Sequence, residues 1–319
     1  MKVLIDVFGC DRPDDIILGM ADAIRAVPDV TLVASGKRSY IEERLASESF
    51  DRTRLEFIDA PEVITNDDSP VMAIRKKKES SLVMAYEALR TRDDLPIMIS
   101  AGNTGAILVG AILILGRENR LDRPTLATFL PNDKGGVTCL ADCGANVDCR
   151  PEYLVKYAKY ASEHMRRVYG IEQPRVALLS VGVEDEKGNM QSKETFSLLR
   201  EDRELNFVGN MESREALSGK YDVIVADGFA GNILLKSIEG TARTVISRLV
   251  SNLKKHAPIG TDLSFIKEAV AELNSTIDFN SMGGAVILGA RKPIIKAHGS
   301  ANRDTVVNTV KQAIKIIDN

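Results

Sequence analysis

Short apolar runs recur along the chain, and each is followed by a segment of helical length. Several runs are apolar throughout, which is typical of strands covered on both faces of a sheet. The alternation of strand and helix predicts an α/β fold with a largely parallel sheet and one continuous catalytic unit over residues 1–319. The predicted strands are Lys2–Val7, Val30–Ser35, Arg54–Ile58, Pro96–Ser100, Gly136–Asp142, Arg175–Val181, Leu205–Gly209, Tyr221–Ala226 and Pro293–Ala297.

The segment from about residue 233 to 275 interrupts this alternation, because it carries two helical patterns and no strand pattern. In the first helix, apolar residues recur at helical spacing, at Leu234, Ile238, Ala242, Val245 and Leu249. The sequence KKHAPIGTD then breaks the helix, and 263–273 forms the second. We predict a helical hairpin that projects from the α/β body. Its apolar stripe is too wide for a lightly covered helix, so it serves either extra core packing or a dimer interface.

A small polar loop, SAGNTGA, separates a buried strand from an apolar helix predicted over 103–116. At such a strand end, glycine lets the backbone approach an anion closely, and the first N–H groups of the helix point toward it. The loop lacks the GxGxxG of dinucleotide sites and the GKS or GKT of Walker loops. It is either an ordinary helix cap or an anion site, whose candidate residues are Ser100, Gly102, Asn103, Thr104 and Gly105.

Four later strand ends carry comparable loops, in DCGANVDCRPE, VGVEDEKGN, DGFAGN and HGSAN. Each loop alone is compatible with ordinary turn chemistry, whereas all of them with SAGNTGA predict one composite cleft. The candidate residues in and beside these loops are Asn146, Asp148, Lys187, Asn189, Asp227, Asn232, Lys236, Lys296, His298 and Ser300.

A basic run from Arg75 to Lys78 precedes a serine pair and a helix. Charge runs usually form a solvated face, but cations followed by hydroxyl groups also suit a phosphate. The candidate residues of this run are Arg75, Lys77, Lys78 and Ser80.

Composition narrows the range of partners. The formal net charge of -3 does not predict a nucleic-acid partner, and no apolar run reaches the ~18 residues of a membrane span. The chain enters a strand pattern at once, without a signal peptide. The cysteines Cys10, Cys139, Cys143 and Cys149 form neither a CxxC pair nor a disulfide framework, and the histidines lie far from them. We expect a cytosolic, reduced protein without a metal.

Together these segments resemble the phosphate acyltransferase family of bacterial phospholipid synthesis, which moves a fatty acyl group from acyl carrier protein to inorganic phosphate. The matching stretches are NDDSPVMAIRKKKESS, SAGNTGA, DRP at 122–124, DCGANVDCRPE, KGN at 187–189, LNFVGN, DGFAGN with LK at 235–236 and EG at 239–240, and GGA at 283–285 with IKAHGS. They follow the family's order from residue 3 to the C-terminus, so the resemblance covers essentially the whole chain.

The resemblance implies a mixed-sheet, three-layer α/β/α fold related to isocitrate and isopropylmalate dehydrogenases and to phosphotransacylases. It also implies a homodimer built partly through the hairpin, no metal or organic cofactor, acyl carrier protein as a partner, and a downstream acyl-phosphate:glycerol-3-phosphate acyltransferase. It leaves open a transient peripheral membrane contact, although the KKHAPIGTD tip is more polar than a membrane-dipping tip should be.

Within this resemblance, Asn103 and Thr104 would hold phosphate, with Lys187 as the cationic partner. His298 is a candidate acid for the leaving sulfur. The candidates for stabilising the tetrahedral oxyanion are Asn146, Asn189 and Asn232.

Two positions depart from the family pattern. The first loop of the family is similar to D-x-M-G-G-D, whereas this chain has Cys10 in the place of a glycine, and Val286 stands where proline often follows GGA. Because Cys10 lacks the conformational freedom of glycine, we expect the shape of that loop to change.

Three alternatives remain open. Cys149 could act as a covalent nucleophile, although a small buried cysteine is the simpler interpretation. A short-chain acyl-coenzyme A phosphotransacylase would share the fold and the loops. A non-catalytic acyl-carrier or lipid-binding relative would keep the fold with an altered first loop, and phosphate-dependent turnover of an acyl thioester separates it from an enzyme.

Overall fold

The computed structural model describes residues 1–117, 123–258, 264–277 and 283–319. These residues form one mixed sheet of eleven strands in the order β3-β2-β1-β4-β11-β10-β5-β6-β9-β7-β8. The strands are β1 (Lys2–Asp6), β2 (Thr31–Gly36), β3 (Leu55–Asp59), β4 (Met98–Ser100), β5 (Thr125–Pro131), β6 (Val137–Ala141), β7 (Arg175–Ser180), β8 (Asn206–Glu212), β9 (Val223–Val225), β10 (Ala285–Leu288) and β11 (Ile294–Lys296).

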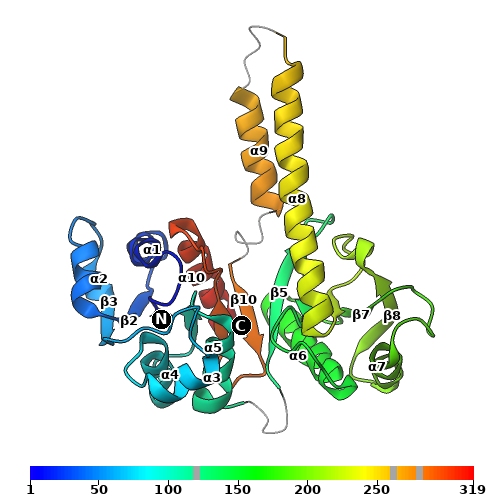
Figure 1. Ribbon diagram of the computed structural model, residues 1–319, viewed down its shortest axis with the longest axis horizontal. Helices are drawn as coiled ribbons and strands as arrows, with labels where there is room; N and C mark the ends of the chain where they lie inside the picture. The colour runs from blue at the N-terminus through cyan, green and yellow to red at the C-terminus, as the bar shows by residue number, and fades with distance from the viewer. Residues whose placement is uncertain (118–122, 259–263, 278–282) are drawn as a thin grey trace.

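Helices cover both faces of the sheet (Figure 1), and each face has its own hydrophobic core. One core includes residues of α1, α2, α6, α7 and α10, and the other includes residues of α3, α4, α5 and α8. The predicted three-layer α/β/α architecture is therefore confirmed. The helices are α1 (Pro13–Ala26), α2 (Arg38–Arg44), α3 (Pro70–Lys76), α4 (Ser81–Thr91), α5 (Thr104–Gly110), α6 (Pro151–Tyr169), α7 (Met190–Glu201), α8 (Gly228–His256), α9 (Ser264–Ile277) and α10 (Arg303–Asp318).

All nine predicted strands are present, with ends that shift by one to three residues. The prediction missed two strands, β5 and β10, which lie side by side at the centre of the sheet. In β5 (TLATFLP) threonines and alanine interrupt the apolar run, and β10 (AVIL) has only four residues. Neither segment therefore shows a strand pattern of the usual length.

These two strands reverse the direction of the sheet. β10 pairs antiparallel with both β11 and β5, and β5 pairs antiparallel with β6, so β6 to β9 run opposite to β1–β4. The register nevertheless places one row of residues across five strands, at Ile295, Val286, Ala127, Ala141 and Val225. Ile295 is next to last in β11, while Ala141 and Val225 end β6 and β9. The carboxyl ends of oppositely directed strands therefore meet at the centre of the sheet.

Helix α8 begins directly on the loop that follows β6. The amide of Gly228 donates to the carbonyl oxygen of Asn146 at 2.7 Å. A Cβ on Gly228 would lie 2.6 Å from that same oxygen, and a Cβ on Gly231 would lie 1.9 Å from the carbonyl oxygen of Asp142. Both glycines of the DGFAGN motif are thus required for close packing of the helix on this loop.

Beyond its first turns, α8 leaves the body and forms the predicted hairpin with α9 (Figure 1). The buried residues of α8 lie near its start, whereas Val245 and Leu249 further along are 58% and 51% exposed. Core packing therefore accounts only for the base of the apolar stripe. Part of the KKHAPIGTD segment, residues 259–262, lies outside the described residues. None of the described helices combines the length and the apolar composition that crossing a bilayer requires.

The contact between α8 and the β6 loop predicts opposite effects at two glycines of one helix. Gly231→Ala should lower the free energy of unfolding by about 1–3 kcal/mol, because the added methyl group overpacks the backbone of Asp142. Gly240→Ala is the matched control, since its added Cβ would meet no atom within 4 Å. It should raise the free energy of unfolding by about 0.5–1 kcal/mol through better helix propensity. Urea denaturation measures both, and a Gly231→Ala variant as stable as the wild type would contradict the packing.

Candidate active site

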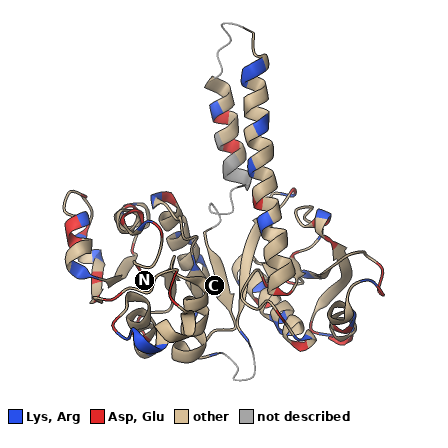
Figure 2. Cartoon of the chain, viewed as in Figure 1, with Lys and Arg blue, Asp and Glu red and all other residues tan. Residues whose placement is uncertain are grey.

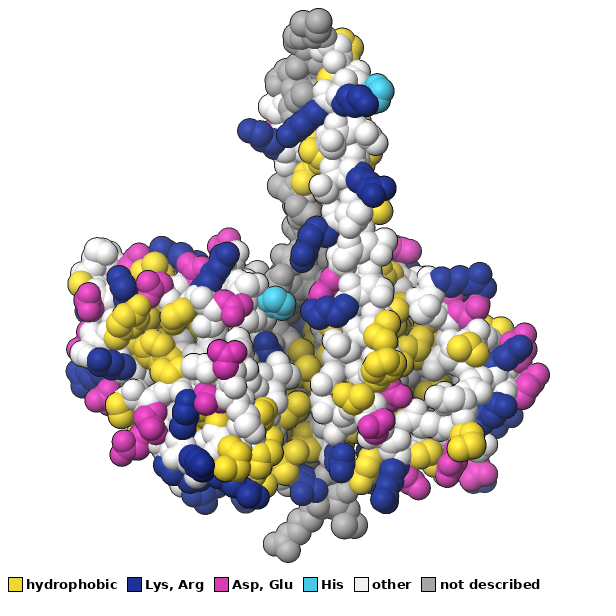
Figure 3. Space-filling view, viewed as in Figure 1, with side chains coloured by type: hydrophobic (Ala, Val, Ile, Leu, Met, Phe, Trp, Pro, Cys, Tyr) yellow, Lys and Arg dark blue, Asp and Glu magenta, His cyan; other side chains and the backbone are white. Residues whose placement is uncertain are grey.

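A hollow of about 390 Å³ lies between the base of α8 and the adjoining ends of β10 and β11. It belongs to the groove that separates the β1–β4 half of the molecule from α8 (Figure 3). Of the five predicted loops, four contribute to its lining, while VGVEDEKGN does not. The lining residues are Thr104, Leu126, Thr128, Cys143, Gly144, Asn232, Leu235, Lys236, Glu239, Gly283, Gly284, Ala285, Lys296 and His298.

The carboxylate of Asp142 holds the DCGAN loop against this pocket. Asp142 is fully buried and accepts hydrogen bonds from the amides of Gly144, Ala145 and Asn146 at 3.0, 2.9 and 2.7 Å. Asn146 Nδ2 also donates to Asp142 Oδ2 and to the carbonyl oxygen of Pro124, both at 2.9 Å. Both protons of the Asn146 side-chain amide are thus engaged, one by the loop itself and one by Pro124, so this predicted oxyanion donor positions the backbone instead.

The carboxylate of Asp6 lies buried beneath the SAGNTGA loop. Ser100 Oγ donates to Asp6 Oδ2 at 2.7 Å, and the amide of Gly102 donates to Ser100 Oγ at 3.2 Å. Burial raises the pKa of Asp6 to about 6. A Cβ on Gly102 would lie 3.3 Å from Ser100 Oγ and 3.6 Å from Asp6 Oδ2. A side chain at Gly102 would therefore disturb the buried hydrogen bond between Ser100 and Asp6. Its effect on activity would not come only from blocking the approach of an anion.

Two other residues of the same loop shape the start of α5. Asn103 Oδ1 accepts from a backbone N–H of the first turn at 3.0 Å, and its Nδ2 donates to carbonyl oxygens of the 65–66 turn at 3.4 and 3.3 Å. A Cβ on Gly105 would lie 2.7 Å from Pro70 of α3, so this glycine allows α3 and α5 to pack closely. Thr104 is the residue of the loop that lines the pocket.

The pocket is cationic on the side formed by β11 and α8. Burial, reinforced by Lys236, lowers the pKa of Lys296 to about 8. Burial and both lysines lower the pKa of His298 below its ordinary value. Lys236 is paired with Glu239 at 2.8 Å. An anion bound here would compensate the burial and the repulsion that lower the pKa values of Lys296 and His298, so the arrangement favours a phosphate-like ligand.

Ser300 orients the ring of His298. The amide of Ser300 donates to His298 Nδ1 at 3.3 Å, and Ser300 Oγ lies 2.8 Å from the same nitrogen. A backbone N–H can only donate, so Nδ1 is an acceptor and the proton of the neutral ring lies on Nε2. His298 can therefore donate a hydrogen bond through Nε2.

Several predicted residues lie outside the pocket lining and cap helices. Asn189, Asp227 and Ser80 accept hydrogen bonds from first-turn amides of α7, α8 and α4 at 2.8, 2.7 and 3.4 Å. Lys187, on the loop before α7, is exposed, as is Asp148. The structure brings neither to the pocket lining.

In the basic run, Lys77 holds the preceding loop, donating to Asp68 at 2.6 Å and to the carbonyl oxygen of Val63 at 2.9 Å. Lys78 donates to the carbonyl oxygen of Ile74 at 3.1 Å, and Arg75 is exposed. This run forms a solvated rim and does not line the pocket.

The cysteines show no feature of an activated nucleophile. Burial raises the pKa of Cys149 and of Cys10 to about 11. Cys10 carries no backbone strain: the positive φ of the first loop, 82°, is at Gly9, and Asp29 is the only described non-glycine residue with positive φ. The expected change in the shape of this loop relative to the family stays a prediction. Within the described residues, no cluster of three or more His, Cys, Asp or Glu side chains is placed to hold a metal ion.

Some residues at the site were not predicted. Thr128 belongs to the missed strand β5. Glu239 follows Lys236 by three residues on one helix face, and this spacing of opposite charges could have revealed it. Asp6 and Asp142 share another signal, a carboxylate at the end of an apolar strand, where it must find hydrogen-bond donors.

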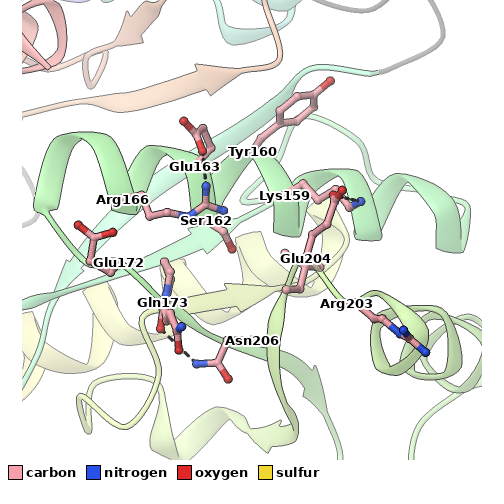
Figure 4. Close-up of a pocket in the computed structure, with 12 residues that line it drawn as sticks. Lys159, Tyr160, Ser162, Glu163, Arg166, Glu172, Gln173, Arg203, Glu204 and Asn206 are labelled. Atoms are coloured by element: carbon pink, nitrogen blue, oxygen red, sulfur yellow. Dashed lines mark hydrogen bonds and ion pairs between the residues drawn. The ribbon is translucent and has the colours of Figure 1, made fainter.

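A larger hollow, about 730 Å³, lies elsewhere, beside α6 and the starts of β7 and β8 (Figure 4). Its charged side chains pair with one another: Lys159 bonds Glu204 at 2.7 Å, and Arg166 bonds Glu163. None of the predicted loops contributes to it. We therefore place the chemistry in the smaller pocket.

Known proteins resemble this chain over its whole length. A model of the family described as fatty acid synthesis protein matches residues 1–319. The phosphate acyltransferase of Clostridioides difficile (strain 630) is 40% identical over 316 residues, covering 99% of this chain and 92% of that protein. That of Bacillus pumilus (strain SAFR-032) is 42% identical over 320 residues, covering 100% and 94%.

Solved structures share the fold at low identity. The EutD phosphotransacetylase from Staphylococcus aureus aligns with a TM-score of 0.63 and 15% identity, covering 99% of this chain and 92% of that one. A putative 4-hydroxythreonine-4-phosphate dehydrogenase from Salmonella typhimurium aligns with a TM-score of 0.56 and 16% identity, covering 99% of each chain. The expected likeness in fold to phosphotransacylases is therefore confirmed, whereas the likeness to isocitrate and isopropylmalate dehydrogenases stays a prediction.

The lowered pKa of Lys296 predicts pH-dependent anion binding. Sulfate keeps the same charge across neutral pH and is a suitable probe for calorimetry. Lys296 is charged below its pKa of about 8 and neutral above it, so sulfate should bind best below pH 8 and weaken as pH rises through it. Lys296→Met should remove most of this pH dependence, and Lys187→Met is the control that should keep it. A wild-type affinity that does not change between about pH 7 and pH 9 would contradict the assignment.

Proposed function

The chain belongs to the fatty acid synthesis protein family, with relatives such as the 40% identical phosphate acyltransferase, and we propose that it transfers a fatty acyl group from acyl carrier protein to inorganic phosphate. The products are an acyl phosphate and the free carrier protein, an early step of phospholipid synthesis. Identity over the whole chain carries this proposal, and the cationic pocket supplies what the reaction requires. A short-chain acyl-coenzyme A phosphotransacylase is the second candidate, favoured only by the shared fold at 15% identity.

In this proposal, phosphate lies between two lining residues, Lys296 at the end of β11 and Thr104 at the start of α5. Holding the anion beside the thioester makes the encounter effectively unimolecular. A phosphate oxygen attacks the carbonyl carbon, and Asn232, an exposed lining residue, donates to the oxyanion. Neither metal nor organic cofactor is required, because phosphate is itself the nucleophile.

Collapse of the tetrahedral intermediate breaks the C–S bond and forms the acyl phosphate. Hydrogen phosphate loses one proton as it becomes acylated, and the departing thiolate gains one, so no net proton is released. Lys296 and His298 line one side of the pocket and have pKa values lowered toward or below neutrality. They are the groups suited to pass this proton, and the bound dianion raises both pKa values.

The carrier protein docks, in this proposal, on the rim formed by α3. This helix exposes Val71, Met72, Arg75 and Lys76, which gives an apolar surface beside cations. Lys and Arg gather at the end of α3 (Figure 2). Through Pro70 the helix packs against the start of α5, and thus beside the pocket. Acyl carrier proteins are strongly acidic, so this rim would speed their encounter with the enzyme.

A second copy of the chain covers the exposed stripe of the hairpin in this proposal. Val245, Leu249 and Leu253 are each more than 40% exposed on α8, and Phe265 is exposed on α9. Apolar stripes of this extent are usually buried in an interface. We place the dimer in the cytoplasm, with the basic end of α8 at 254–256 available for transient contact with an anionic membrane surface. A downstream acyl-phosphate:glycerol-3-phosphate acyltransferase would consume the reactive product.

Phosphate-dependent turnover tests the reaction directly. Incubation with acyl-acyl carrier protein should yield an acyl hydroxamate on trapping with hydroxylamine, only when phosphate is present. Asn232→Ala should lower kcat by about 10²-fold with a smaller effect on the phosphate KM, because its donor acts on the transition state. Turnover that is equally fast without phosphate, or that accepts only short acyl-coenzyme A thioesters, would contradict the proposal.

A charge reversal on α3 separates carrier docking from phosphate binding in the same assay. Arg75→Glu/Lys76→Glu should raise the KM for acyl-acyl carrier protein and flatten its salt dependence, leaving the phosphate KM within about twofold. Lys77 is left in place, because it holds the preceding loop through Asp68.

The dimer makes an independent prediction. Val245→Asp/Leu249→Asp would bury two carboxylates in the interface, at a cost of several kcal/mol. We expect a monomer or an aggregate in light scattering. A well-behaved dimer would place the interface elsewhere.

A further inference from the structure

We propose that the fatty acyl chain of the thioester lies across an apolar surface at the base of α8, formed by Phe229, Ile233, Val147, Val181, Val183 and Met190. We name this the α8-base surface. The proposal rests on the proposed function and adds the site that would select the length of the chain.

Outside the hairpin, exposed large apolar side chains concentrate on this surface. Phe229 and Ile233 on the first turns of α8 are 59% and 49% exposed. Val147 on the loop after β6 and Met190 at the start of α7 are 54% and 87% exposed. Apolar side chains gather beside the base of α8 in the space-filling view (Figure 3). A contiguous exposed apolar patch of this kind marks a binding surface more often than an accident of folding.

Hydrogen bonds and strand pairing bring these segments together. The amide of Gly228 bonds the carbonyl oxygen of Asn146 at 2.7 Å, which places Phe229 and Val147 next to that contact. The side chain of Gln191 donates to the carbonyl oxygen of Cys149 at 2.6 Å, which brings the start of α7 to the same loop. β7 and β9 pair with Leu178 opposite Val225, so the loops that leave them are also neighbours. Three loops thus build one surface.

The surface adjoins the pocket along a single helix. Asn232 and Lys236 line the pocket, while Phe229 and Ile233 occupy the adjacent strip of the same helix. Gly240 continues that strip, and a Cβ there would meet no atom within 4 Å. A thioester carbonyl held at Asn232 therefore has an open apolar path beside it.

The geometry of a thioester fits the two sides of the pocket. The sulfur and the acyl chain are bonded to the same carbonyl carbon and extend from it in different directions. The basic α3 rim belongs to the half of the molecule with β1–β4, and the α8-base surface belongs to the half with β7 and β8 (Figure 1). With the carrier protein on the α3 rim, the acyl chain points across α8 toward this surface.

Charge argues against the carrier protein itself as the occupant. Val183 is followed by the exposed carboxylates of Glu184, Asp185 and Glu186. These carboxylates would repel an acidic protein, whereas they exert no electrostatic repulsion on an uncharged hydrocarbon chain. Burial of the chain would be worth about fourfold in affinity for each covered methylene, which corresponds to about 0.8 kcal/mol.

Chain-length kinetics test the proposal. The variant is Phe229→Ser/Ile233→Ser, and the control is Val208→Ser, which is exposed to a similar degree on β8. With hexadecanoyl-acyl carrier protein, kcat/KM of the double variant should fall by about tenfold or more, whereas with octanoyl-acyl carrier protein it should change by less than about threefold. The control should match the wild type with both. An equal fall with both substrates, or no fall with the longer one, overturns the proposal.

Two further measurements test the surface without relying on turnover and check whether the double variant keeps its oligomeric state. Calorimetry with dodecanoyl phosphonate and acetyl phosphonate should show tighter binding of the longer analogue to the wild type, and loss of that advantage in the double variant. Equal binding of both analogues to the wild type overturns the proposal, even if the enzyme proves to have another activity. If light scattering shows that the double variant has become monomeric while its chain-length profile is unchanged, the surface is a contact between copies and the proposal fails.

Discussion

The buried carboxylate of Asp142 is the interaction on which the rest of the site depends. A buried charge is costly unless it is hydrogen-bonded, and here three successive amides and the Asn146 side chain satisfy it. These bonds shape the loop, and the first turn of α8 packs on that loop. Gly231 of α8 contacts the backbone carbonyl of Asp142 so closely that there is no room for a side chain. One carboxylate thus fixes the DCGAN loop and, through it, the direction of the helix that carries Asn232 and Lys236.

The reversal of the sheet explains how distant motifs come to share one pocket. In a purely parallel sheet, all carboxyl ends lie on one edge, and the loops line up along it. Here β10 and β5 reverse the direction, and the register brings the ends of β6 and β9 level with the end of β11. Helix α8 then runs from β9 past Lys296 and His298, so the pocket lies between two halves that run in opposite directions. The two parts of a thioester substrate, the carrier arm and the acyl chain, can therefore extend from the pocket on different sides.

The sequence predicted the layers, nine of the eleven described strands and the hairpin, because hydrophobic periodicity reports burial directly. It did not reveal β5, whose apolar run is interrupted by threonines, or β10, nor the reversal that these two strands create. Among the predicted site residues, Asn103, Asn189 and Asp227 occupy helix N-caps outside the pocket lining. The same residue types cap helices and bind anions, so sequence alone cannot assign them. Lys296 differs in that its pKa depends on burial and on Lys236, sixty positions earlier in the chain, which only the folded structure brings together.

The central claim is that phosphate binds in the pocket where the two halves meet. A crystal structure of the protein with inorganic phosphate is the most direct test. We expect the anion within hydrogen-bonding distance of Lys296 Nζ and beside Thr104, with Asn232 facing it across the pocket. An anion bound instead by Lys187 at the start of α7, or by Lys159 and Arg166 in the hollow beside α6, would contradict the account.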